Sequence, residues 1–284
     1  MKAGIAYIRK ELAGLYSSGE IERFVFLIFE KLKGYDRTRF LLSREEILTT
    51  VEQSDLIQIV NRLKAQEPIQ YILGETIFYD LPFICRPGVL IPRPETEELV
   101  DWIIQQNEIS APTILDVGTG TGCIAITLKK NIPEAKVLAC DISTDCLDLA
   151  GKNSEVNDVD IQCFEWDVLN QKPATTWPAF HIIVSNPPYV TGKEKKQMER
   201  NVLDFEPELA LFVPDDNALL FYKRIADLAL DLLVENGTLY FEINEAYGSE
   251  CASMLQDKGF QNIQIRKDIN GKDRMIYAKR KNKI

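Results

Sequence analysis

The chain has few of the residues on which many catalytic sites depend. It contains one histidine, His181, among 284 residues, so a histidine-based triad or a histidine-rich metal site is a poor fit. Its six cysteines are scattered and form no Cys-x-x-Cys pair, so no dithiol centre is indicated. We expect reduced, mostly buried thiols, as in a cytoplasmic protein. We also expect no bound metal.

Long apolar runs and an excess of basic residues are missing too. No stretch reaches the roughly 18 apolar residues that a membrane span needs, and the amino terminus lacks the apolar core of a signal peptide. We therefore expect no membrane association. The net charge of −10 argues against broad attraction to a nucleic-acid backbone. The first 72 residues are nearly neutral, so the acidity lies in the remainder of the chain.

The amino-terminal part has a helical pattern. Apolar residues between positions 8 and 32 recur at helical spacing, and Ser43 with Glu46 has the spacing of a capping box that would open a helix through about residue 52. This part carries no candidate catalytic cluster. We therefore predict a helical domain at residues 1–66 that docks the substrate rather than acting on it.

Residues 67–97 change character. Aromatic and β-branched residues alternate between turn signals at 73–74, 79–80 and 86–88, which predicts a β-hairpin connector. A helix is predicted to begin near Thr96, a plausible cap, because an apolar stripe at helical spacing follows it.

Residues 98–284 alternate between strand and helix patterns. The clearest helix is predicted at 217–235, and strands are predicted at 113–117, 136–141, 160–164, 181–186, 237–243, 260–266 and 273–279. This alternation predicts an α/β domain with a doubly wound, mostly parallel, seven-stranded Rossmann-like sheet.

A glycine-rich loop follows the first of these strands, in "ILDVGTGTGCIAI". A dinucleotide fingerprint would need glycine where Cys123 stands. Asp116 suits a cationic amino group, and Asp141, one strand later, is placed for a ribose diol. An adenosine ligand that carries an amino acid meets both demands, which predicts S-adenosylmethionine; a turn without a ligand is the alternative. The predicted contacts in the loop are Gly118, Thr119, Gly120, Thr121 and Gly122.

Two further strand ends carry candidate contacts. In "FEWDV", Asp167 is placed to meet the exocyclic amine of adenine, with Val168 beside it, or else is a surface acid. In "HIIVSNPPYV" an apolar strand ends in Asn186 and two prolines. Because prolines fix φ and cannot continue a sheet ladder, this segment predicts a rigid loop that holds Asn186 and nearby carbonyl groups for a polar ligand.

Four segments together resemble one family: "EPIQYILGE", "LIPRPETEELV", "VSNPPYV" and "FEPELAL". They are similar to those of the HemK/PrmC family, class I S-adenosylmethionine-dependent methyltransferases. These enzymes act on the glutamine of the Gly-Gly-Gln tripeptide in peptide chain release factors. The resemblance implies a release factor as partner, S-adenosylhomocysteine as product, and a cytoplasmic enzyme. We expect a monomer.

The resemblance also implies roles for particular residues. Asn186 and the Pro187 carbonyl would accept the two amide hydrogens of the target, and Tyr189 would pack near the amide plane, with Pro188 completing the substrate site. Asn186 would also border the cofactor. Val168 stands where many family members have an aromatic residue.

Two other functions remain open. Asn-Pro-Pro-Tyr is shared with amino-methyltransferases that act on adenine or another base in DNA or RNA, which would have to hold an unstacked base. An inactive scaffold that binds the cofactor is a third interpretation. The acidic balance and the lack of a long basic segment favour the glutamine methyltransferase, without direct sequence-specific binding to nucleic acid.

Overall fold

A computed structural model describes residues 1–281 and divides them into two compact units. The first unit comprises Met1–Glu75 with Glu199–Phe205, and the second comprises the other described residues. Within the described range, no helix is long and apolar enough to cross a membrane. The six cysteines, all among the described residues, form no disulfide bond, and all except Cys163 are buried.

The first unit is helical, as predicted. Its apolar faces enclose one core that includes Ile8, Leu12, Ile28, Phe29 and Leu63. Its elements are α1 (Lys2–Leu12), α2 (Ser18–Lys33), α3 (Arg37–Leu42), α4 (Thr50–Lys64), α5 (Ile69–Leu73) and α9 (Arg200–Phe205).

The start of α4 differs from the prediction. The capping box lies at Thr49 and Glu52, where each side chain accepts a hydrogen bond from the other residue's backbone N–H. Ser43 instead ends α3, and Glu46 accepts a hydrogen bond of 2.7 Å from the Tyr35 hydroxyl. The two residue pairs have the same spacing, so the local pattern does not show which pair forms the capping box. The contact of Glu46 with Tyr35, which is not part of that pattern, decides the outcome.

A hairpin precedes the large sheet. Strands β1 (Glu75–Phe78) and β2 (Leu81–Ile84) pair across Tyr79 and Asp80, whose φ angles of 49° and 61° match the tight turns that hairpins favour.

Helix α6 (Pro94–Gln106) begins two residues before the predicted cap, Thr96. The proline suits this first position because it has no N–H to leave unpaired. The Thr96 hydroxyl is therefore available for another partner.

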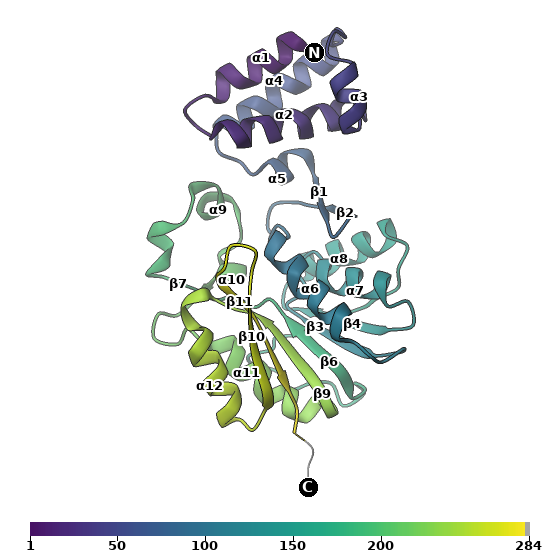
Figure 1. Ribbon diagram of the computed structural model, residues 1–284, viewed down its shortest axis with the longest axis vertical. Helices are drawn as coiled ribbons and strands as arrows, with labels where there is room; N and C mark the ends of the chain where they lie inside the picture. Colours follow the sequence, from purple (N-terminus) through teal and green to yellow (C-terminus); the bar gives the residue numbers. More distant parts are fainter. Residues whose placement is uncertain (282–284) are drawn as a thin grey trace. The chain divides into compact units, whose positions relative to one another are not determined.

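A seven-stranded sheet organises the second unit (Figure 1). The strand order is β10-β11-β9-β6-β3-β4-β5. Strand β11 runs antiparallel to β10 and β9, and all the other neighbouring pairs are parallel. This confirms the predicted doubly wound, mostly parallel sheet. The strands are β3 (Thr113–Val117), β4 (Lys136–Asp141), β5 (Gln162–Glu165), β6 (Phe180–Ser185), β9 (Leu233–Glu242), β10 (Gln261–Lys267) and β11 (Asp273–Lys279).

Helices cover both faces of this sheet. One apolar core lies between the sheet and the helices α6 and α7 (Cys123–Asn131). The other lies between the sheet and the helices α11 (Leu220–Leu232) and α12 (Gly248–Asp257). The remaining elements are α8 (Thr144–Val156), β7 (Val190–Thr191), η1 (Glu194–Gln197), α10 (Glu208–Leu211), β8 (Phe212–Val213) and η2 (Glu245–Tyr247).

Candidate active site

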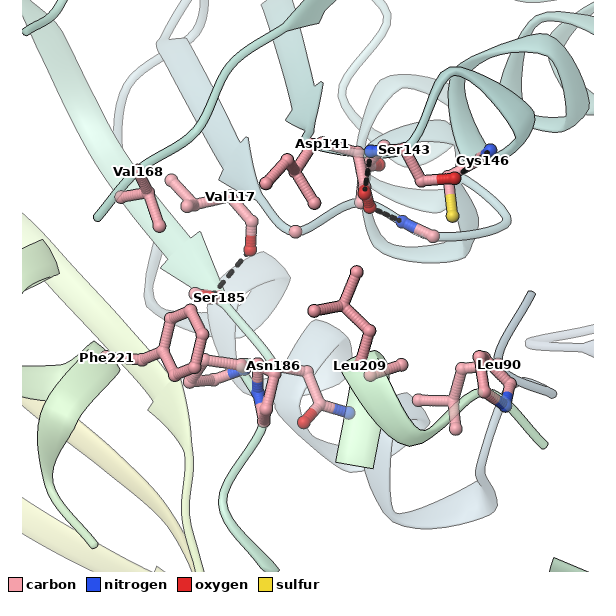
Figure 2. A pocket seen from close by; sticks show the side chains of 18 of the residues that line it. Leu90, Val117, Asp141, Ser143, Cys146, Val168, Ser185, Asn186, Leu209 and Phe221 are labelled. Carbon is pink, nitrogen blue, oxygen red and sulfur yellow. Dashed lines mark hydrogen bonds between the residues drawn. The ribbon is translucent and has the colours of Figure 1, made fainter. Parts of the chain in front are cut away.

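A cavity of about 400 Å³ lies at the carboxyl ends of the parallel strands. Strand β3 has β4 on one side and β6 on the other. The strand order changes direction at this point, which creates the crevice where open α/β sheets bind ligands. Figure 2 shows Asp141 and Ser143 on one side of the cavity and Asn186 on the opposite side, with Leu209 between Asn186 and Leu90.

The glycine-rich loop forms one wall. Gly118, Thr119, Gly120 and Thr121 line the cavity. Gly122 does not, but has a φ of +82°, and a Cβ there would lie 2.9 Å from Ile126 Cδ1 and 3.0 Å from Ala150 Cβ. Glycine at this position therefore allows α7 and α8 to pack closely beneath the loop.

Asp141 lines the cavity at the end of β4. Its Oδ2 accepts a hydrogen bond of 2.9 Å from Gly120 N, and its Oδ1 accepts one of 2.9 Å from Ser143 N. Burial raises the pKa of this carboxyl group. Because a carboxylate oxygen has two lone pairs, each oxygen can still accept a hydrogen bond from a ligand hydroxyl.

Asp116 lies behind the wall rather than on it. Its side chain is fully buried, and its Oδ2 accepts a hydrogen bond of 2.6 Å from the Thr119 hydroxyl. Burial raises the pKa of Asp116 from 3.8 to about 7. The structure therefore places this acid where it supports the loop through Thr119, one layer from the cavity.

The loop after β5 forms another part of the wall. Trp166, Asp167 and Val168 all line the cavity. Hydrogen bonding by Asn170 lowers the pKa of Asp167, whose Oδ2 accepts from Asn170 Nδ2 at 2.8 Å. Val168 packs at the edge of the apolar core, and Figure 2 shows it beside Val117.

The Asn-Pro-Pro-Tyr segment follows β6. Asn186, Pro187 and Pro188 line the cavity, whereas Tyr189 is not part of its wall. The Tyr189 hydroxyl donates to Glu242 Oε1 at 3.1 Å. The structure thus brings Asn186 and both prolines together at the cavity and turns Tyr189 towards the sheet.

Glu242, at the end of β9, was not among the sequence candidates. It is only 1% exposed, and burial raises its pKa. Its Oε2 accepts a hydrogen bond of 2.6 Å from the Thr96 hydroxyl, and Thr96 Oγ1 accepts one of 3.2 Å from Asn186 Nδ2. The signal that could have identified Glu242 is an acid within the apolar strand "TLYFEI", since such an acid needs buried partners.

Glu206 joins two segments of the chain that line the cavity. This buried acid accepts a hydrogen bond of 2.5 Å from Arg93 Nη2 and one of 3.4 Å from Ile91 N. Residues on both sides of this ion pair line the cavity, among them Ile91, Pro207 and Leu209.

Comparison with known proteins identifies the family. Residues 96–204 match the methyltransferase small domain, and residues 5–74 match the PrmC N-terminal domain. A release factor glutamine methyltransferase of Bacteroides thetaiotaomicron is 47% identical over 97% of this chain and 98% of that protein. The chain belongs to the release factor glutamine methyltransferase family. A relative of that name from Flavobacterium psychrophilum is also 47% identical, over 93% of this chain and 94% of its own length.

Solved structures show the same fold. A methyltransferase from Pyrococcus furiosus aligns with a TM-score of 0.54 at 14% identity and covers 82% of this chain and 100% of its own. The T. thermophilus 16S rRNA N2 G1207 methyltransferase aligns with a TM-score of 0.52 at 18% identity over 73% of this chain and 50% of its own. At these identities the comparison concerns the fold alone. The family matches, by contrast, confirm the resemblance that the sequence motifs indicated.

Proposed function

We propose that this protein transfers a methyl group from S-adenosylmethionine to the side-chain amide nitrogen of the glutamine in the Gly-Gly-Gln tripeptide of peptide chain release factors. Membership of the family supports this activity. The observation that carries it is the position of Asn186, which lines the cavity beside two prolines. Its Nδ2 is engaged by Thr96, which leaves its Oδ1 to accept a hydrogen bond from a ligand amide.

The cavity has suitable groups for S-adenosylmethionine. Its volume of about 400 Å³ lies within the usual range for small-molecule sites. Asp141 has lone pairs for the ribose diol, and the loop glycines let a ligand approach the backbone closely. Val168 and Leu209 offer apolar surface for a base, and Asp116 offers negative potential behind the loop when it is ionised. When bound, the cofactor supplies a methyl group on a positively charged sulfur, which is a good leaving group.

The residues of the chain act on the target amide. An amide nitrogen is a weak nucleophile because its lone pair is delocalised. In the proposed mechanism Asn186 Oδ1 and the Pro187 carbonyl accept the two amide hydrogens, which orients the nitrogen and stabilises the positive charge that develops on it. The nitrogen then loses one proton to solvent. Tyr189 holds the loop against Glu242 in this mechanism, instead of packing on the amide.

The proposal includes the partner and the compartment. The protein partner is a peptide chain release factor, and the enzyme works in the cytoplasm, where such a factor would meet it. Its product from the cofactor is S-adenosylhomocysteine, and no metal ion takes part.

The test supplies the purified protein with S-adenosylmethionine that carries a labelled methyl group. Release factor, DNA and ribosomes are offered separately, and mass spectrometry locates the label. We expect it on the glutamine of Gly-Gly-Gln in the release factor. Label on a base in DNA or ribosomal RNA would instead support an amino-methyltransferase acting on nucleic acid, and no transfer at all would support an inactive scaffold.

Replacing Asn186 tests the site. Asn186→Ala should lower kcat about a hundredfold, because the lost hydrogen bond strengthens as charge develops on the nitrogen. Calorimetry should show little change in affinity for S-adenosylmethionine. The control is Asn131→Ala, an exposed position at the end of α7, which should keep full activity. A folded Asn186→Ala variant with the wild-type rate would contradict the catalytic role.

A further inference from the structure

Asn186 can serve as an acceptor only if its side-chain amide has the correct orientation. The two ends of the amide are similar in size, and a rotation of 180° would point the NH₂ group, a donor, at the cavity. A donor there would face the NH₂ group of the target. Something in the protein must therefore distinguish the two orientations.

The hydroxyl of Thr96 makes this distinction. It lies 2.6 Å from Glu242 Oε2 and 3.2 Å from Asn186 Nδ2. A hydroxyl has one hydrogen and a carboxylate only accepts, so the hydrogen of Thr96 is donated to Glu242. Towards Asn186 the Thr96 oxygen is then an acceptor, which selects the orientation with Nδ2 facing Thr96.

The opposite side of Glu242 is fixed in a similar way. Arg274 Nη1 lies 3.5 Å from the Tyr189 hydroxyl oxygen, and a guanidinium group can only donate. Tyr189 therefore directs its own hydrogen to Glu242 Oε1, 3.1 Å away. Both carboxylate oxygens receive a hydroxyl hydrogen. Burial raises the pKa of Glu242, whereas the Thr96 hydroxyl, the charge of Arg274 and the Tyr189 hydroxyl lower it and favour the carboxylate that this arrangement of donors fits.

We propose that Thr96 and Glu242 are positioning residues that fix the amide of Asn186 with its oxygen towards the cavity. The relay runs from Asn186 Nδ2 to Thr96 Oγ1 and from the Thr96 hydroxyl to Glu242 Oε2. Thr96 is 2% and Glu242 1% exposed, so water competes little for these hydrogen bonds. This inference rests on the proposed function, because it explains how the acceptor for the target amide is oriented.

The first test compares two substitutions at one position. Thr96→Val preserves the shape but removes the hydroxyl, and should lower kcat about tenfold or more because the acceptor loses its fixed position. Thr96→Ser keeps the hydroxyl and should stay within about twofold of wild type. The affinity for S-adenosylmethionine, measured by calorimetry, should be the same in both. A folded Thr96→Val variant with wild-type kcat would overturn the proposal.

The second test reverses the relay. In Asn186→Asp the new carboxylate cannot donate to Thr96, so kcat should fall. In Asn186→Asp/Glu242→Gln the glutamine can donate to Thr96 and the threonine to the aspartate, which again leaves an oxygen facing the cavity. The double variant should recover about tenfold in kcat over the single variant. No recovery, with both variants folded and binding the cofactor, would overturn the proposal.

A readout that needs no turnover separates this inference from the proposed function. In ¹⁵N-labelled protein the side-chain NH₂ of Asn186 should exchange slowly with solvent in wild type and Thr96→Ser, and faster in Thr96→Val. If the wild type methylates no release factor, the proposed function fails, but the exchange rate still tests whether Thr96 and Glu242 orient Asn186. Equal exchange rates in all three proteins would overturn the positioning role of Thr96.

Discussion

Asp116 is a residue whose charge depends strongly on the fold. Burial raises its pKa from 3.8 to about 7, so the folded protein binds a proton between these values that the unfolded chain releases. For this residue alone, the free energy of unfolding therefore decreases as the pH rises from about 4 to 7. A cationic ligand near the loop would have the opposite effect on its pKa, because positive charge favours the carboxylate.

Because a cationic ligand would lower the pKa that burial raises, the protein should release protons when S-adenosylmethionine binds. Near pH 7 about half of the free protein holds the proton on Asp116, so binding should release up to about half a proton. Affinity should increase as the pH rises from 5.5 to 7.5. Calorimetry in buffers with different ionisation enthalpies measures this release directly. In Asp116→Asn the side chain can still accept a hydrogen bond from Thr119, but the share of proton release that comes from Asp116 should be lost. Equal proton release by the wild type and this variant would contradict the assignment of the proton to Asp116.

Single residues differ in how far the sequence could predict their place. Asn186 and Asp141 follow directly from strand ends, so the strand pattern alone placed both at the cavity. Tyr189 follows the same strand three residues after Asn186, yet its hydroxyl donates to Glu242 and it is not part of the cavity wall. That contact joins residues far apart in the sequence, as does the contact between Thr96 and Glu242. Neither has a local pattern from which it could be predicted.

Two segments that line the cavity are joined by one ion pair. The segment before α6 and the segment that leads into α10 are linked by Arg93 and Glu206; the carboxylate is buried, whereas the Arg93 side chain is 32% exposed. Hydrogen bonds to charged groups contribute more than neutral ones, and a buried carboxylate is little screened by solvent. The shape of this part of the cavity should therefore respond to the loss of the pair.

Glu206→Gln tests that dependence. It should lower the free energy of unfolding by about 1–3 kcal/mol and raise KM for the release factor, since both segments that line the cavity loosen. The matched control is Glu208→Gln, which breaks the exposed ion pair with Lys195 and should change stability by less than about 1 kcal/mol. Denaturant unfolding and steady-state kinetics measure both quantities. Similar effects of the two substitutions would contradict the role of Glu206.

At the scale of elements, all seven predicted strands are present, but β5, β6, β9 and β10 begin or end one to four residues from their predicted bounds. The predicted bounds of β3, β4 and β11 match the structure, because each is an apolar run whose ends are marked by polar or turn residues. The start of α4 was wrong because two Ser/Thr-x-x-Glu patterns compete within ten residues. Helix α6 does begin near Thr96, at Pro94, but Thr96 is not its cap, and its hydroxyl donates to Glu242 instead.

At the scale of the whole molecule, the two units carry different kinds of surface. All the residues that line the cavity belong to the second unit. The first unit exposes three large apolar side chains between residues 42 and 51: Leu42 is 81%, Ile47 86% and Val51 69% exposed. Contiguous exposed apolar patches are typical of surfaces that bind other proteins, and these three side chains lie within ten residues of one another in the chain. We propose that the helical domain at residues 1–66 docks the release factor through this segment.

The triple substitution Leu42→Ser, Ile47→Ser and Val51→Ser tests the docking role in the full chain. Because these side chains are exposed, stability should change little. KM for intact release factor should rise at least about tenfold, which corresponds to about 1.4 kcal/mol of lost contact. Methylation of a short peptide containing Gly-Gly-Gln should be unchanged, since the peptide engages only the cavity. The control is Val156→Ser on α8, which is 50% exposed and should alter neither reaction. Unchanged kinetics with the intact factor, or an equal loss with factor and peptide, would contradict docking by this segment.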